Sequence, residues 1–297
     1  MFMNNLKLTV SIVNFNAGEY LSSCLKSLEK IKQEVDFKVI VVDNSSSDDS
    51  LQSAKLKFPW IKFIESSENL GFGKANNLVL KNLDTEYILI LNPDTEIGKN
   101  VLNVMLDFMD KNPDVGAASC KVILDNGKID WASHRGFPTP LASLLYFLGN
   151  GSLYHLSNKF MEETHEVDSI SGAFFLTKKS VLKKVSPPVG GFDEDYFMYG
   201  EDLDLSFRIK QAGFKIMYVP EVSIIHHKGV SSGLKAATQK ITTASLETRI
   251  RALDSFYMAM AIFYRKHYSQ NHLIFMNWLV NLGINIKWWL AKRKLVV

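Results

Sequence analysis

The sequence of 297 residues predicts an α/β protein with a mainly parallel central sheet, flanked by helices and followed by a helical tail. Two observations support this fold class. Short β-branched runs alternate with segments whose apolar residues recur at helical spacing, as they do in βαβ units. Acidic segments also follow several apolar runs directly, and ligands of open α/β sheets bind beyond the carboxyl ends of the strands.

The first 111 residues predict four strands and four helices in alternation. The strands are expected at 8–13, 37–42, 61–64 and 87–91, and the helices at 19–31, 48–58, 73–83 and 100–111. Strands and helices that alternate at this length favour right-handed crossovers and a parallel sheet.

The rhythm changes after Val115. Residues 125–168 are rich in turns and aromatic residues and are expected to form an irregular insertion on the substrate side. A strand at 169–177, a helix at 201–212, and strands at 214–219 and 222–226 should then complete the sheet. The helix should end at Gly213, because glycine favours the left-handed conformation that follows many helices.

Two parts are therefore expected, residues 1–235 as the main domain and 236–297 as a helical tail, with the small polar stretch 231–243 between them. The hydrophobic and charged fractions, 46% and 22%, are ordinary for a globular protein. The net charge of +3 hides an asymmetry, because no Asp or Glu follows Ser255 while six basic residues do. The main domain is mildly acidic and the tail is basic.

Two features indicate a cytoplasmic protein. Cys24 and Cys120 lie in apolar segments without metal-binding spacing, which predicts buried free thiols in a reducing compartment. The first residues lack the basic stretch and long apolar run of a signal peptide.

Asp43 directly follows a predicted buried strand. The serines and Asp48 after it suit the N-terminus of a helix, but a capping role does not use Asp43 itself. A carboxylate at this position can accept hydrogen bonds from a nucleobase or a ribose. We therefore interpret Asp43 as a nucleotide-binding residue.

Gly71 and Gly73 precede a predicted helix, but a third glycine is absent and the segment follows the third strand. This arrangement disfavours a dinucleotide-binding dehydrogenase. The backbone N–H groups at the helix start, together with Lys74, could still meet a phosphate or a base.

Asp94 follows the fourth strand after Asn92 and Pro93. Asp94 could cap the next helix, or it could bind Mg²⁺ or Mn²⁺ that bridges the phosphates of a nucleotide sugar. His226 and His227 end the last strand, and one of them could complete such a site.

Glu201, Asp202 and Asp204 open the predicted helix at 201–212. Acidic residues in a first turn are common, and Asp204 with Arg208 forms a helical i,i+4 pair. A general base must stay ionised within hydrogen-bond reach of the acceptor hydroxyl. Asp202 or Glu201 could fill that role.

Taken in order, these segments resemble family 2 glycosyltransferases of the GT-A fold, and most of all their bacterial rhamnosyltransferase-like branch. The resemblance spans residues 8–235. Its motifs are SIVNFN at 11–16, VVDNSSSD at 41–48, NLGFGKANN at 69–77, LNPDT at 91–95, SGAFFL at 171–176, GGFDEDYFMYGEDLDLSFR at 190–208 and HHKGVSS at 226–232.

The resemblance implies an inverting transfer from a nucleoside-diphosphate sugar, with Mg²⁺ or Mn²⁺ as cofactor. It assigns the base to Asp202 and the metal to Asp94 and His226. Donor binding is expected from Val13, Asn14, Asp43, Ser45, Gly71, Lys74 and Asn92, and acceptor or sugar binding from Gly172, Phe192, Asp193 and Glu201. Asn92 departs from the family's frequent Asp-x-Asp pattern, so Asp94 is the only carboxylate of this motif.

The expected donor is dTDP-L-rhamnose, and the expected acceptor is a glycan or polyprenyl-linked hydroxyl in cell-surface polysaccharide synthesis. One alternative is a nucleotidyltransferase, although the loop at 14–18 lacks the basic residues of a phosphate-binding loop. Another is a non-catalytic subunit that binds nucleotide sugars. No nucleic-acid partner is expected, and a homodimer is a further expectation.

The tail combines tryptophans, basic residues and an apolar run from 273 to 290, with Asn277, Asn281 and Asn285 spaced as one helical stripe. This pattern fits a helix lying on a membrane better than one spanning it. We therefore expect a peripheral protein on the inner face of the cell membrane. The alternative is a tail that packs on the main domain or forms a dimer.

Overall fold

The computed structural model describes residues 6–156, 161–185, 191–227 and 245–296. Its first half follows the predicted alternation closely. The elements are β1 (Leu8–Asn14), α1 (Glu19–Ile31), β2 (Phe37–Asp43), α2 (Ser50–Lys57), β3 (Lys62–Glu65), α3 (Phe72–Leu80), β4 (Tyr87–Leu91), β5 (Thr95–Ile97) and α4 (Val101–Lys111). The short strand β5 is the one element that the pattern did not predict.

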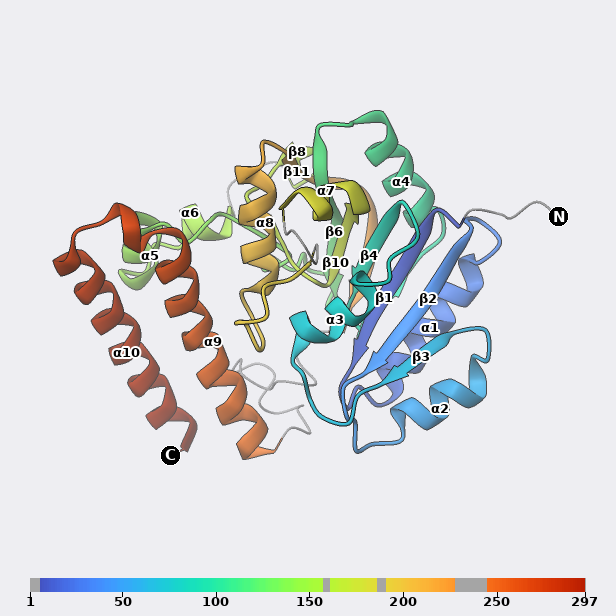
Figure 1. The fold of residues 1–297 in the computed structure, drawn as a ribbon, viewed down its shortest axis with the longest axis horizontal. Coiled ribbons are helices and arrows are strands. Elements are labelled where there is room, and N and C mark those ends of the chain that lie inside the picture. Colours follow the sequence, from blue (N-terminus) through green and yellow to red (C-terminus); the bar gives the residue numbers. More distant parts are fainter. Residues whose placement is uncertain (1–5, 157–160, 186–190, 228–244, 297) are drawn as a thin grey trace.

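The central sheet has the strand order β3-β2-β1-β4-β10-β6-β11-β5, with β8 paired to β11. Strands β3, β2, β1 and β4 are parallel, whereas β10 runs antiparallel to both of its neighbours. Helices cover both faces (Figure 1). Apolar side chains of α1, α2 and α4 fill one face, and those of α3, α7 and α8 fill the other.

The second half of the sheet contains a strand that the sequence reading missed. Strand β6 (Val115–Leu124) lies between β10 and β11 and pairs with β11 in parallel. The expectation that 125–168 is irregular is also wrong in part. This insertion contains β7 (His134–Arg135), α5 (Pro140–Phe147), α6 (Ser152–His155) and β8 (His165–Glu166).

The strand predicted at 169–177 is two strands, β9 (Ser169–Ile170) and β10 (Phe174–Lys178), separated by a turn at 171–173. The turn moves the chain from the β7–β9 pair into the main sheet. After α7 (Lys179–Val185) and α8 (Glu201–Gln211), the two strands predicted at the end are one, β11 (Lys215–His226). Its register shifts between Val219 and Ser223, around Pro220, which cannot donate a backbone hydrogen bond.

The tail forms α9 (Leu246–His267), a short 3₁₀ turn η1 (Ser269–Asn271) and α10 (Ile274–Val296). Helix α9 packs on the main domain, where Ala259, Ile262 and Phe263 form a cluster with Tyr196 and Leu203. Helix α10 lies on the outer side of α9 (Figure 1). The boundary predicted at residue 235 lies outside the described residues.

Candidate active site

The loops after β1 and β2 are joined by a buried polar cluster. The Asn14 side-chain amide donates to Asp43 Oδ1 at 2.7 Å and to Ser50 Oγ at 2.8 Å. The Ser46 backbone N–H donates to Asp43 Oδ2 at 3.0 Å. Asp43 is only 3% exposed, so its carboxylate organises this loop pair. Asn14 and Asp43 face each other in the β1–β2 register, as expected from parallel strand ends.

A surface depression of about 400 Å³ lies beside these loops, lined by Asn16, Ala17, Gly18, Glu19, Tyr20, Ser23 and Asp48. Asn16 Oδ1 accepts from the Ser47 backbone N–H at 2.7 Å, and the Gly18 N–H donates to Asp48 at 2.9 Å. The Tyr20 ring lies 5.4 Å from the ring of His227. The depression therefore extends from the predicted nucleotide loop toward the end of β11.

The remaining predicted donor residues lie in different environments. Val13 is buried in the core, whereas Ser45 and Lys74 are exposed. Gly71 has a φ of +82°, and a Cβ there would lie 2.1 Å from the Phe197 carbonyl oxygen. The Phe72 N–H donates to this same oxygen at 3.0 Å, so the start of α3 is fixed to the loop before α8. Gly71 is thus required by close backbone approach.

Asp94 and His226 meet at the end of the sheet, as the sequence predicts. Asp94 Oδ1 lies 3.2 Å from His226 Nε2, and Asp130 Oδ2 lies 3.4 Å from His226 Nδ1. Burial alone would lower the pKa of His226, but hydrogen bonds to Asp130 and Asp94 raise that pKa to about 9. The second histidine, His227, instead pairs with Glu96 at 2.9 Å and with Asp125 at 2.5 Å.

This geometry fits a divalent cation held by two protein ligands, which would displace the proton that His226 Nε2 shares with Asp94. Asp94 Oδ1 and His226 Nε2 are near enough to share one ion, and Asp130 holds the other ring nitrogen as an outer carboxylate often does. The two acids face opposite ring nitrogens, so they do not converge on one point. Accordingly, no cluster of three or more metal-ligating side chains occurs within the described ranges.

The turn between β9 and β10 connects this end of the sheet to α8. The Gly172 N–H donates to Asp202 Oδ2 at 3.3 Å, and the Asn92 N–H donates to the Ala173 carbonyl at 3.5 Å. A Cβ on Gly172 would lie 2.8 Å from the Phe72 ring and 3.8 Å from Asn92 Oδ1. Gly172 therefore lies where the start of α3, the Asn92 loop and Asp202 come together.

The two first acids of α8 have different environments. Asp202 accepts from Gly172 and also lies 3.4 Å from a guanidinium nitrogen of Arg135. Glu201 is 6% exposed, and its Oε2 has no hydrogen-bond partner among the described residues. Burial, with the nearby charge of Asp202, raises the pKa of Glu201 to about 8. Burial therefore favours the protonated form of Glu201, whereas Asp202 is the acid of the two whose carboxylate is held by Gly172 and Arg135.

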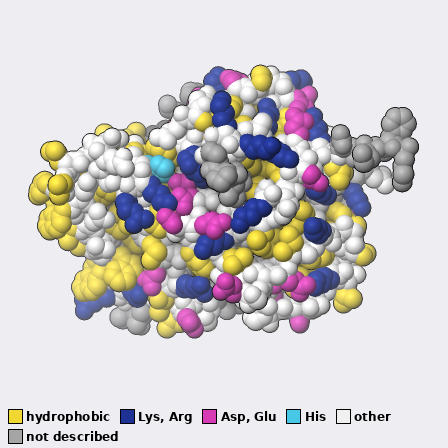
Figure 2. All heavy atoms as spheres, in the orientation of Figure 1, with side chains coloured by type: hydrophobic (Ala, Val, Ile, Leu, Met, Phe, Trp, Pro, Cys, Tyr) yellow, Lys and Arg dark blue, Asp and Glu magenta, His cyan; other side chains and the backbone are white. Residues whose placement is uncertain are grey.

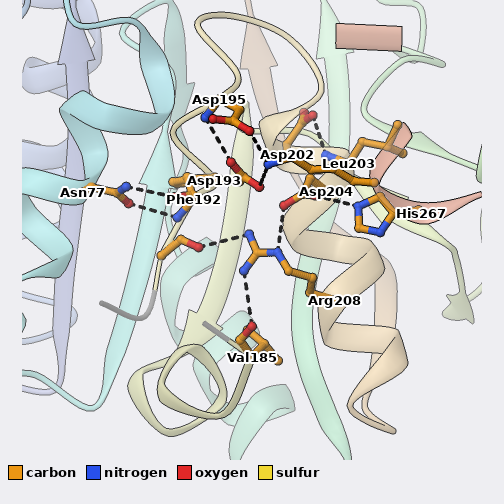
Figure 3. Close-up of polar contacts among 12 residues, drawn as sticks. Asn77, Val185, Phe192, Asp193, Asp195, Asp202, Leu203, Asp204, Arg208 and His267 are labelled. Carbon is orange, nitrogen blue, oxygen red and sulfur yellow. Dashed lines mark hydrogen bonds and ion pairs between the residues drawn. The ribbon is translucent and has the colours of Figure 1, made fainter. Parts of the chain in front are cut away.

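A polar network fixes α8 to its neighbours (Figure 3). Arg208 Nε donates to Asp204 at 2.7 Å, and Asp204 also accepts from His267 of α9 at 2.7 Å. Asn77 of α3 bonds the backbone N–H and carbonyl of Phe192, both at 2.9 Å (Figure 3).

Two predicted acceptor residues take part in packing at this end of α8. Phe192 is buried against α3, and Asp193 is paired with Lys266 of α9. These contacts give both side chains a structural role. Their predicted role in binding the acceptor or the sugar stays a prediction.

Sequence reasoning missed Arg135 and Asp130, which contact the predicted base and the predicted metal histidine. Both belong to the insertion at 125–168, where no periodic pattern indicated which residues would point inward. A lone arginine in an aromatic segment, Arg135, was the available signal, because buried charges need partners.

Comparisons with known proteins identify the family of this chain. A family model described as "Glycosyltransferase like family 2" matches residues 5–253. The N-acetylglucosaminyl-diphospho-decaprenol L-rhamnosyltransferase of Mycobacterium tuberculosis is 27% identical over 249 residues, covering 78% of this chain and 79% of that protein. Rhamnosyltransferase WbbL of Escherichia coli is 27% identical over 227 residues, covering 73% and 82%.

Solved structures share the fold. Staphylococcus aureus TarS (residues 1–349) superposes with a TM-score of 0.55 at 18% identity, covering 95% of this chain and 80% of that chain. GalNAc-T7 with UDP, GalNAc and Mn²⁺ superposes with a TM-score of 0.56 at 16% identity, covering 97% and 57%. At these identities the likeness concerns the fold alone, and it confirms the GT-A type of α/β arrangement.

Proposed function

The chain belongs to the glycosyltransferase-like family 2, and we propose that it is an inverting, metal-dependent member that acts in cell-surface glycan synthesis. The observation that carries the proposal is the position of Asp202. Its carboxylate is oriented by the Gly172 N–H and Arg135, next to the Asn92 loop that leads to Asp94 and His226.

The proposed reaction is one displacement. Asp202 takes the proton of an acceptor hydroxyl while the hydroxyl oxygen forms a bond to the anomeric carbon of the donor sugar. The bond from that carbon to the diphosphate breaks, and the nucleoside diphosphate leaves with the electron pair. Attack from the face opposite the leaving group inverts the configuration, so no covalent enzyme–sugar intermediate forms.

Glu201 is proposed to contact the sugar or the acceptor in its protonated form. Glu201 directly precedes Asp202, and its Oε2 has no hydrogen-bond partner among the described residues. A neutral carboxyl can donate a hydrogen bond, which a carboxylate cannot do. Environment therefore gives the two neighbouring acids separate functions, one as proton acceptor and the other as hydrogen-bond donor.

We propose that Asp94 and His226 hold Mg²⁺ or Mn²⁺. When bound, the cation would supply positive charge for the diphosphate that departs. Asn92 contributes a neutral amide where the Asp-x-Asp pattern implied by the family resemblance has a carboxylate, so binding of the metal should depend on the donor phosphates for further oxygen ligands. Asp130 would keep His226 oriented through its other ring nitrogen.

The donor is proposed to lie across the ends of β1 and β2, with its nucleotide in the depression beside Asn16 and Tyr20. The Asn14–Asp43–Ser46 cluster would then shape the floor for the base and the ribose. Two rhamnosyltransferases among the relatives support L-rhamnose as the donor sugar. The proposed carrier of that sugar is dTDP. The mycobacterial relative is named for an N-acetylglucosaminyl-diphospho-decaprenol acceptor, which supports a polyprenyl-diphosphate-linked acceptor here.

A membrane surface is the proposed location of this acceptor. None of the helices in the described ranges is both long and apolar enough to cross a bilayer. Helix α10 nevertheless exposes large apolar side chains, with Phe275 at 67%, Trp278 at 59% and Trp289 at 49%. Figure 2 shows hydrophobic side chains gathered on the left, where Figure 1 places the α9–α10 hairpin.

The charge of the tail supports the same partner. Lys287, Arg293 and Lys294 are exposed on α10, and anionic lipid head groups attract such residues. The polar groups Asn277 and Trp288 Nε1 instead bond to α9, at Tyr264 and Asp254. The apolar side chains therefore face outward, as an interfacial helix requires.

The proposed function is tested with purified protein, dTDP-rhamnose and other nucleotide sugars, and Mg²⁺ or Mn²⁺. Ligand binding raises thermal stability by mass action, so melting temperatures identify the donor without an acceptor. The Asp94→Asn variant should lose the extra stabilisation that the metal gives to the nucleotide complex. Equal stabilisation in that variant and in the native protein would contradict the metal assignment.

The catalytic assignment is tested by Asp202→Asn, with Asp36→Asn at an exposed position as the matched control. Transfer to a lipid-linked acceptor should fall by about 10²-fold or more in Asp202→Asn, while nucleotide binding persists. Full transfer activity in that variant would show that Asp202 is not the base. A native protein that binds nucleotide sugars but transfers none of them would favour the non-catalytic alternative.

A further inference from the structure

Arg135 is the residue that connects the insertion to the proposed base. It lies on β7, and one of its guanidinium nitrogens is 3.4 Å from Asp202 Oδ2. Another donates to the Tyr154 hydroxyl of α6 at 3.3 Å. Its side chain is 20% exposed, and its Nε has no hydrogen-bond partner among the described residues.

The strand that carries Arg135 is fixed on several sides. Strand β7 pairs with β9, with Arg135 opposite Ser169. The next residue, Gly136, donates its backbone N–H to the Tyr154 carbonyl at 2.9 Å, and a Cβ there would lie 2.3 Å from the Leu153 carbonyl oxygen. Close packing of α6 on Gly136 therefore holds both ends of the Arg135–Tyr154 contact.

The charges around Asp202 make this contact important. Glu201 and Asp204 on α8 are acids, Tyr154 on α6 is neutral, and Asp130 in the insertion is a further acid whose charge acts on Arg135. Within the described ranges, Arg135 is the one cation in ion-pair contact with Asp202. Without it, Asp202 would have only the Gly172 and Leu203 N–H groups to support its charge, with the carboxylate of Asp204 in the same helix.

We propose that Arg135 is a positioning residue that pairs with the Asp202 carboxylate and keeps it turned toward Gly172, while Tyr154 holds the guanidinium in place. This inference depends on the proposed function, because it concerns the base of that reaction. It explains why an insertion outside the strand-end motifs reaches the centre of the site. It also distinguishes the two adjacent acids of α8. Arg135 pairs with Asp202, whereas burial raises the pKa of Glu201 to about 8.

The experiment measures the pH dependence of kcat for Arg135→Gln and Arg135→Lys. Removal of an adjacent positive charge raises the pKa of a carboxylate by about 1–3 units, so the acidic limb should move upward by that amount in Arg135→Gln. Activity at pH 6 should then fall by about tenfold or more relative to the native protein at the same pH, and this deficit should shrink as the pH rises toward 7.5. Arg135→Lys keeps the charge, so its acidic limb should stay close to that of the native protein.

Matched measurements separate the possible causes. Arg265→Gln, at an exposed arginine of α9, should leave the pH profile unchanged. Tyr154→Phe should give a smaller shift in the same direction as Arg135→Gln, because the charge stays but one support of the guanidinium is lost. Nucleotide-dependent thermal stabilisation reports whether each variant is folded and binds donor.

Three results would overturn the inference. One is an acidic limb in Arg135→Gln that coincides with the native limb. Another is a loss of activity, relative to the native protein at each pH, that is the same at pH 6 and at pH 7.5. If Arg135→Gln does not fold, Arg135→Lys provides the third test. An acidic limb shifted by a full pH unit in that variant would show that the positive charge at residue 135 is not what supports Asp202. Failure of the proposed function is distinct, because Asp202→Asn would then retain transfer.

Discussion

Protonation of Glu201 in the folded protein predicts an unusual dependence of stability on pH. In the unfolded chain this carboxyl ionises near pH 4.5, whereas in the fold its pKa is about 8. Between these values the folded state holds a proton that the unfolded state has lost. The free energy of unfolding should therefore fall as pH rises from about 4.5 to about 8, and this contribution should level off above that range.

The size of the effect follows from the same values. Each pH unit corresponds to about 1.4 kcal/mol, so the span from pH 4.5 to pH 7 amounts to roughly 3 kcal/mol. Glu201→Gln replaces the protonated acid by a neutral group of nearly the same shape. The variant should equal the native protein in stability near pH 5 and exceed it near pH 7, by about 6 °C in melting temperature.

Thermal unfolding of both proteins from pH 5 to pH 8 is the assay, with Glu68→Gln at an exposed position as the control. The control should follow the native curve at every pH. Parallel curves for Glu201→Gln and the native protein would show that Glu201 is ionised in the fold, and the assignment of separate functions to the two acids would then fail.

Three further predictions concern other parts of the molecule. Gly71→Ala should cost about 1–3 kcal/mol more than Gly213→Ala, because both glycines have positive φ but only a Cβ at Gly71 meets a neighbouring carbonyl; equal losses would contradict this. Replacing both Phe275 and Trp289 by Asp should abolish sedimentation of the protein with anionic vesicles, whereas Leu56→Asp, at another exposed apolar residue, should not. If the double variant instead turned a dimeric protein into a monomer, the exposed face of α10 would be a site of self-association. Both cysteines should resist a thiol reagent at pH 8 until the protein unfolds, because burial raises the pKa of each thiol.

The parallel half of the sheet could be predicted because its strands are short and clear helices separate them, and because β1, β2 and β4 are buried almost throughout. Asn14, Asp43 and Asp94 could be found because each follows such a strand, where side chains of neighbouring strands must meet. The prediction of buried free cysteines is confirmed by the same logic, since both lie within apolar segments.

The other half depends on long-range pairing that no local pattern shows. Strand β10 enters the sheet antiparallel between β4 and β6, and the turn that lets it do so carries the Gly172 N–H to Asp202. Arg135 belongs to a strand of two residues, too short for a period to appear. Asp130 meets His226 across a separation of 96 residues. Such contacts follow from the three-dimensional fold, and sequence spacing alone does not predict them.

The tail has two helices with different tasks, and truncations should separate them. Helix α9 supports α8, since Phe263 packs in one cluster with Leu203 and His267 bonds the buried Asp204 (Figure 3). Burial would raise the pKa of Asp204, but the hydrogen bond to His267 and the charge and hydrogen bond of Arg208 lower it. Without α9, the Asp204 carboxylate would lose its hydrogen bond to His267. Asp204 lies in α8, the helix that begins with Glu201 and Asp202.

A chain ending at residue 254 should therefore lose thermal stability and transfer activity together, even with an acceptor that needs no membrane. A chain ending at residue 272 removes α10 alone. It should keep nucleotide binding and transfer to a water-soluble acceptor, and lose only binding to vesicles. Full activity in the shorter chain would show that α9 does not support the site. Loss of nucleotide binding in the longer chain would show that α10 is part of the catalytic fold.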